Sequence, residues 1–249
     1  MARRKVLMLR SPDRGVSKHA LWLPGAAAVL SAAFLSGVAL AHDPAHPAPR
    51  VELEGPADAY VYELAAPGSY DLPRIKPAGG GRLLDDTGAA VELGALFEDR
   101  LTIFAFMYTR CGDVCPLAAL RLADLQRLAA EDATLARQVQ ILSLSFDPDH
   151  DTPAVMADYA EMMRAPEIDA PHWLFLTAAG PAEIAPLLGA YDQPVARKAD
   201  PDDPSGPLSH LLRVFLIDGE GFIRNIYSAD FLDPRLLMND LRTLQRDAH

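Results

Sequence analysis

The feature that most constrains this 249-residue sequence is an apolar and aromatic segment, LTIFAFMY, at residues 101–108. A run of this length bounded by polar residues is typical of a β-strand that is buried on both faces. Pro116 follows after a short loop and opens a segment rich in leucine and alanine that extends to Ala130. Proline is favoured at the first position of a helix, and leucine and alanine have high helix propensity. The sequence therefore predicts a buried strand that leads through a short loop into a helix.

The rest of the C-terminal part continues this alternation. We expect a small hairpin around residues 83–93, strands at 139–146 and 173–177, helices at 153–164 and 181–188, paired strands at 211–217 and 222–227, and a final helix from Pro234. Parallel strand and helix units followed by an antiparallel hairpin and a helix predict an α/β, thioredoxin-like fold. We expect a mixed sheet with helices on both faces and an extra N-terminal hairpin.

Residues 1–41 have the composition of a signal peptide or a membrane anchor. Six of the 23 Lys and Arg residues lie in this segment, all before an uncharged stretch from Ala20 to Ala41. The stretch ends in the small-x-small pattern that signal peptidase recognises, but it exceeds the ~7–15 residues of a usual signal h-region. It also matches the ~20 residues needed to span a bilayer. We expect the following domain to face the periplasm, either anchored to the inner membrane by residues 20–41 or secreted after cleavage at Ala41.

Residues 42–67 are rich in proline, alanine and acidic residues and have no sustained period of 2 or 3.6. This composition is typical of a semi-rigid linker. Two histidines in the tract, His42 and His46, are expected to be solvated rather than to bind metal. The thioredoxin-like domain is then expected to occupy residues 68–249.

The residues after Ala41 are strongly acidic, in contrast to the basic N-terminal segment. The whole chain has a formal charge of −11, but only one of its 34 acidic residues lies before residue 42, against six of the 23 basic ones. Nucleic acids and anionic lipids attract basic surfaces. The charge therefore argues against nucleic acid as a partner and is compatible with cations or with a basic protein.

Both cysteines, Cys111 and Cys115, lie in the loop between the first predicted strand and its helix. With Pro116 as the first helical residue, Cys115 is expected to be the cap residue, where free backbone N–H groups and the helix dipole favour its thiolate. Structural disulfides are common in an oxidising compartment. A bond between these two cysteines would close only a short loop and would give little of the ~2–4 kcal/mol typical of such disulfides. The spacing therefore favours redox or metal chemistry.

Two thiolates suit a soft ion such as Cu(I), whereas Mg²⁺ and Ca²⁺ require oxygen ligands. Candidates for a third ligand are His150, His172 and His210. His150 lies in an acidic loop and His172 directly precedes a predicted strand, and exposed histidines are ordinary in both places. His210 leads into the predicted strand 211–217, beside the loop that faces the active-site helix in thioredoxin folds. Spacing alone leaves His210 equally open to a role as ligand and as solvated loop residue.

Three motifs resemble those of the Sco (SenC) family in their order and spacing. They are YTRCGDVCP at 108–116, SFDPDHDTP at 145–153, and SH at 209–210 followed by LIDGEG at 216–221. The resemblance spans roughly Gly68 to Arg246, and three concordant motifs are more specific than the cysteine spacing alone. Sco proteins are membrane-anchored or exported copper proteins needed to assemble cytochrome c oxidase. The resemblance implies that Cys111, Cys115 and His210 are the copper ligands and that Asp147 lies near them.

The resemblance further implies a copper chaperone. Such a protein takes Cu(I), with Cu(II) as a second candidate, from a periplasmic donor and passes it to the dinuclear copper site of a terminal oxidase subunit. An alternative is a thiol-disulfide oxidoreductase that uses Cys111 and Cys115 as a catalytic pair to reduce the client's copper-ligand cysteines. A peroxidase on the same fold fits less well, because the Pro-rich Thr/Ser-x-x-Cys loop of a peroxidatic cysteine is missing.

Two residues depart from the family pattern. Gly112 stands where the family often has proline, and Ser209 stands where it often has aspartate. Loss of an acidic neighbour is expected to weaken the orientation of the His210 imidazole, because such partners hold metal-ligating histidines in place. We expect the second departure to affect copper affinity more than copper binding itself.

Overall fold

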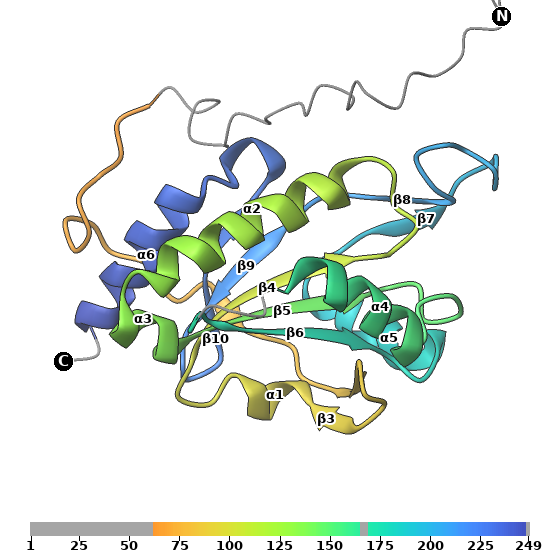
Figure 1. The fold of residues 1–249 in the computed structure, drawn as a ribbon, viewed down its shortest axis with the longest axis horizontal. Helices are drawn as coiled ribbons and strands as arrows, with labels where there is room; N and C mark the ends of the chain where they lie inside the picture. The colour runs from red at the N-terminus through yellow and green to blue at the C-terminus, as the bar shows by residue number, and fades with distance from the viewer. Residues whose placement is uncertain (1–61, 165–168, 248–249) are drawn as a thin grey trace, which may run out of the picture. The chain divides into compact units, whose positions relative to one another are not determined.

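A computed structural model describes residues 62–164 and 169–247 of the chain (Figure 1). The predicted signal peptide or anchor, the linker up to residue 61, and His42 and His46 lie outside the described residues. None of the helices within these described residues combines the length and the apolar character that a membrane span requires.

The described residues form an eight-stranded sheet with the strand order β1-β10-β9-β4-β5-β6-β2-β3. The strands of this sheet are β1 (Lys76–Pro77), β2 (Arg82–Asp85), β3 (Ala90–Glu92), β4 (Leu101–Met107), β5 (Val139–Ser145), β6 (His172–Thr177), β9 (Val214–Ile217) and β10 (Phe222–Tyr227). A separate two-stranded sheet contains β7 (Val195–Arg197) and β8 (Leu208–His210). The helices are α1 (Leu93–Leu96), α2 (Val114–Ala130), α3 (Ala133–Gln138), α4 (Pro153–Met163), α5 (Pro181–Ala190), the 3₁₀ helix η2 (Ala229–Phe231) and α6 (Pro234–Asp247).

The centre of the sheet is parallel and its flanks are antiparallel. Strand β5 runs parallel to both β4 and β6, whereas β9 runs antiparallel to β4, with Phe104 opposite Phe215. The predicted N-terminal hairpin is present as β2 and β3, with Leu83 opposite Val91, and β2 also pairs with β6. The mixed sheet is therefore confirmed, and the hairpin extends it by two strands.

Side chains of strand β4 alternate between two faces that pack against different helices. On one face the ring of Phe104 lies 4.9 Å from that of Tyr191, directly after α5, and 6.2 Å from that of Phe215, between centroids. On the other face Ala105 lines a small cavity together with residues of α2 and with Tyr159 of α4. Helix α6 packs against α2 (Figure 1). Helices thus cover both faces, as the sequence predicts.

The segment before β1 is already attached to the domain at its first described residues. The Tyr62 hydroxyl donates to Asp233 at the start of α6, and Asn239 of that helix donates to the carbonyl of Ala65. Further along the helix, the Gly68 N–H donates to the Thr243 hydroxyl. These hydrogen bonds hold the segment alongside α6.

The expected strand 211–217 is wrong in its first half. Residues 208–210 instead form β8, which pairs with β7, and the main-sheet strand β9 begins only at Val214. Because β8 belongs to a different sheet, the chain needs residues 211–213 to cross to the main sheet. His210 therefore ends one strand rather than leading directly into another.

Candidate metal centre

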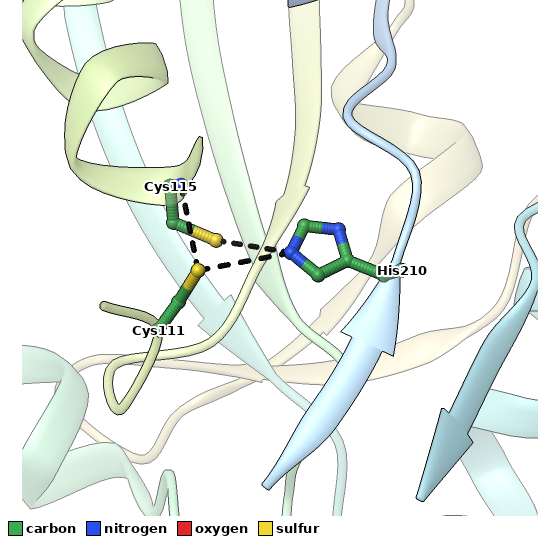
Figure 2. Close-up of side chains that lie close together, drawn as sticks. All are labelled: Cys111, Cys115 and His210. Atoms are coloured by element: carbon green, nitrogen blue, oxygen red, sulfur yellow. Dashed lines mark hydrogen bonds between the residues drawn. The ribbon is translucent and has the colours of Figure 1, made fainter. Parts of the chain in front are cut away.

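Three side chains from three separate elements meet at one point (Figure 2). Cys111 lies in the loop after β4, Cys115 lies in the first turn of α2, and His210 is the last residue of β8. The Nε2 atom of His210 is 3.4 Å from the Cys115 sulfur and 3.8 Å from the Cys111 sulfur. The three possible ligand atoms all lie within 4.8 Å of one another. Both cysteines are buried and unpaired by any disulfide.

The other two candidate histidines are elsewhere. His150 is exposed in the loop after β5, and His172 is exposed at the start of β6. Within residues 62–164 and 169–247, the cluster of two cysteines and His210 is the one group of three His, Cys, Asp or Glu side chains with this proximity. The structure therefore separates His210 from the two histidines that spacing alone leaves as alternatives.

The Cys111 sulfur occupies the position of a helix cap. Helix α2 begins at Val114, so Cys115 is its second residue rather than the cap residue expected from Pro116. The N-cap residue, Asp113, makes no capping hydrogen bond with its side chain. Instead, the backbone N–H of Cys115 donates to the Cys111 sulfur, 3.4 Å away. The free N–H groups at the helix start therefore stabilise negative charge on Cys111.

This arrangement shifts the pKa values of the two cysteines in opposite directions. A hydrogen bond from the Cys115 side chain holds the pKa of Cys111 well below its ordinary value, with help from His210 and backbone N–H groups and against the effect of burial. The same interaction, together with burial, raises the pKa of Cys115. The expectation that the helix start favours the Cys115 thiolate is therefore wrong, because Cys111 accepts the hydrogen bonds that Cys115 donates.

The loop 198–207, which precedes β8, makes hydrogen bonds that place His210 beside the cysteines. His210 is 95 residues from Cys115 in the sequence. The Gly112 N–H donates to the carbonyl of Ser205 at 3.3 Å, and the Tyr108 hydroxyl lies 3.3 Å from that carbonyl and 3.0 Å from the carbonyl of Leu208. These bonds hold the loop against the cysteine-bearing segment and place the start of β8 beside it.

Two glycines allow this close approach. Gly206 has a φ of +93°, and a Cβ there would collide with the Tyr108 hydroxyl and lie 2.5 Å from the carbonyl of Arg110. A Cβ on Gly112 would lie 2.6 Å from the carbonyl of Pro204. Real Cβ atoms do not approach this closely, so a proline at position 112 would push the loop away. The departure at Gly112 is thus explained by packing.

The imidazole of His210 is fixed on two sides. Its ring packs against those of Phe146 and Tyr108, with centroids 5.0 and 5.8 Å away. Its Nδ1 atom is 3.3 Å from the carbonyl oxygen of Leu211. When the neutral ring carries its proton on Nδ1 and donates it to this carbonyl, the lone pair of Nε2 faces the two sulfurs and is free to bind a metal. When the proton is on Nε2 instead, the ring donates to the Cys111 sulfur. Ser209, which stands where the family often has aspartate, is exposed, and the partner of Nδ1 is the backbone carbonyl of Leu211.

Two carboxylates hold the segment before Cys111. Asp147, which sequence analysis places near the site, pairs with Arg110 at 2.6 Å. Asp151 is fully buried and accepts hydrogen bonds from the backbone N–H of Thr109 at 2.9 Å and from the Ser145 hydroxyl at 2.5 Å. Sequence analysis missed Asp151 and Tyr108 as supporting residues. The only signal for Asp151 was its place beside the capping Thr152 in an acidic loop.

Comparison with known proteins identifies the family. Residues 79–246 match the SCO1/SenC family model. The chain belongs to the SCO1/SenC family. It is 28% identical to the SenC protein of Rhodobacter capsulatus over 149 residues, which cover 59% of this chain and 62% of that protein. It is 27% identical to the mitochondrial SCO2 homolog of Bos taurus over 146 residues, which cover 59% of this chain and 52% of that protein. The matched region thus spans little more than half of these relatives.

A solved structure of a family member agrees with the fold. The structure of Bradyrhizobium japonicum ScoI with copper bound has a TM-score of 0.53 and 25% sequence identity, and the match covers 66% of this chain and 99% of that one. The thioredoxin-like fold predicted from the sequence is thereby confirmed.

We predict that the reduced, metal-free protein holds one thiolate at pH values well below the ordinary cysteine pKa of about 8.5. A lowered pKa means that Cys111 loses its proton as pH rises well before a free thiol does. Thiolate absorbance in an ultraviolet pH titration measures this directly. Cys115→Ala removes the strongest hydrogen-bond donor to Cys111, so the transition should move to higher pH. A wild-type transition at the ordinary value, or one that persists unchanged in Cys111→Ser, would contradict the assignment.

Proposed function

We propose that Cys111, Cys115 and His210 bind one copper ion. The observation that carries this proposal is the approach of the His210 Nε2 atom to both cysteine sulfurs, at 3.4 and 3.8 Å. Two sulfur ligands select a soft ion such as Cu(I), and an imidazole suits Cu(I) and Cu(II) alike. The copper bound to the 25% identical ScoI of Bradyrhizobium japonicum supports the same choice of metal here.

The acidity of the two cysteines suits reversible uptake of the ion. Cys111 is the thiolate that a metal meets first, whereas Cys115 must release its proton before it binds. Three protein ligands leave an incoming ligand from a partner free to attack the ion. Copper can therefore leave by ligand exchange, without a change in oxidation state and without turnover of a substrate.

The biological role that fits this chemistry is delivery of copper during assembly of cytochrome c oxidase. In this proposal the acceptor is the dinuclear copper site of an oxidase subunit, and a periplasmic donor supplies the ion. Membership of the SCO1/SenC family supports the role. The basic start and the uncharged segment 20–41 support export, with the domain facing the periplasm either on an inner-membrane anchor or after cleavage.

We predict that the reduced wild-type protein binds one equivalent of Cu(I). Competition with a chelator of known affinity measures both stoichiometry and affinity. Cys111→Ser and Cys115→Ser should each abolish tight binding, because each removes a thiolate. His210→Ala should retain binding at lower affinity. His150→Ala is the matched control, since that exposed histidine lies outside the cluster and should bind copper as the wild type does.

Stoichiometric tight binding by either serine variant would refute the site. Unchanged affinity in His210→Ala would move the third ligand elsewhere.

A thiol-disulfide oxidoreductase is the second candidate, and the low pKa of Cys111 favours it. In that reaction the Cys111 thiolate attacks a client disulfide and forms a mixed disulfide, while one client sulfur leaves as a thiolate. Cys115 then loses its proton and attacks Cys111, which releases the second client sulfur. The client gains two electrons, and Cys111 and Cys115 become a disulfide.

The two functions can be separated by supplying reduced client. If copper delivery is the role, oxidase assembly with the client cysteines held reduced by an added reagent should still require this protein. His210→Ala should then impair assembly, because metal transfer needs the imidazole and disulfide exchange does not. Full assembly by His210→Ala, combined with loss of assembly in Cys111→Ser, would favour the oxidoreductase.

A further inference from the structure

The carbonyl oxygen of Leu211 is a shared acceptor beside the metal centre. It lies 3.3 Å from the Nδ1 atom of His210 and accepts a second hydrogen bond, at 2.7 Å, from the side-chain amide of Gln193. Leu211 belongs to the irregular segment between β8 and β9, so strand pairing does not fix the direction of its carbonyl. The Gln193 amide is therefore the group that holds this carbonyl in place.

Gln193 itself is firmly anchored. Its backbone N–H donates to the carbonyl of Leu188 near the end of α5 at 2.8 Å. It lies two residues after Tyr191, which is buried against the rings of Phe104 and Phe215. The Gln193 side chain is itself buried. The hydrogen bond to Leu211 thus connects the domain core to the carbonyl that faces the imidazole.

The other end of the Gln193 side chain is unusual. Its Oε1 atom is buried and has no hydrogen-bond partner among the described residues. Buried polar atoms normally have partners, and an exception calls for an explanation. A methionine or leucine would fill the same space without this orphaned acceptor. The donor end of the amide is therefore the end with a role.

We propose that Gln193 is a positioning residue for His210. It donates to the Leu211 carbonyl, and that carbonyl in turn accepts the Nδ1 proton, so that Nε2 faces Cys111 and Cys115. This inference rests on the proposed copper site and deepens it. It also accounts for Ser209, because a carbonyl held by Gln193 takes over the orienting task of the aspartate that often precedes the histidine in the family.

The expected consequence is a change in tautomer and in affinity. Without Gln193 the Leu211 carbonyl can turn away, and the proton on Nδ1 loses its acceptor. The imidazole then populates the form protonated at Nε2, which cannot bind the metal through that atom. Loss of a partner of this kind typically lowers metal affinity by about 10–100-fold.

The test uses Gln193→Met with Gln126→Met as its matched control. Gln126 is also a buried glutamine whose amide donates to one backbone carbonyl, that of Pro171, at 2.8 Å. It lies on α2 about 16 Å along the helix from Cys115, at about 1.5 Å per residue. Both variants lose one buried hydrogen bond of the same type, so thermal unfolding should change similarly. Gln193→Leu serves as a second variant if Gln193→Met does not fold.

Two measurements decide the outcome. Nitrogen-15 NMR of the histidines in the reduced, metal-free protein should show a larger Nε2-protonated population of His210 in Gln193→Met, with no change in Gln126→Met. Cu(I) competition should show affinity about 10-fold or more lower in Gln193→Met alone. Unchanged tautomer populations, unchanged affinity, or equal losses in both variants would overturn the inference. The NMR result is independent of copper, so failure of the copper site in the wild type would be recognised separately.

Discussion

The geometry of the candidate metal centre depends on the hydrogen bonds that hold the loop 198–207 against the segment before Cys111. Through them the Tyr108 hydroxyl reaches the backbone carbonyls of Ser205 and Leu208, and Gly112 reaches Ser205. Without this contact, β8 would lose the hydrogen bonds that join it to the cysteine-bearing segment, and the distance from His210 to the cysteines would be less constrained. The contact requires glycine at position 206, because any side chain there would collide with Tyr108.

The start of helix α2 determines which of the two cysteines carries the negative charge. Cys111 accepts the hydrogen bonds available at the helix start, and Cys115 donates one of them, so the pair shares its charge unequally. Arg110 and Asp147, together with the buried Asp151, fix the backbone that leads into Cys111. A soft metal that replaces the proton of Cys115 finds two sulfurs and an imidazole already close together. This proximity reduces the reorganisation that metal binding requires.

Much of this architecture follows from local sequence patterns. Strand β4 lies in a nearly continuous apolar run, so its burial on both faces could be predicted, and the cysteines could be placed at a helix start from Pro116. The short helix α3 was missed because it consists of only six residues, begun by the Asp132 side chain. Strand β8 was missed because its three residues contain no apolar run and pair with β7 across the loop 198–207. The choice of His210 required the family resemblance, since its contact with Cys115 crosses 95 residues. Gln193 gave no signal at all, because its role depends on one hydrogen bond to a loop carbonyl.

The central claim is that one copper ion binds to two cysteine sulfurs and one histidine nitrogen of this chain. X-ray absorption spectroscopy of the protein loaded with one equivalent of Cu(I) tests it most directly, because sulfur and nitrogen neighbours differ in distance and scattering. The account predicts two sulfur neighbours and one imidazole nitrogen, with the imidazole signal lost in His210→Ala. A spectrum without imidazole scattering in the wild type, or one that His210→Ala leaves unchanged, would contradict it.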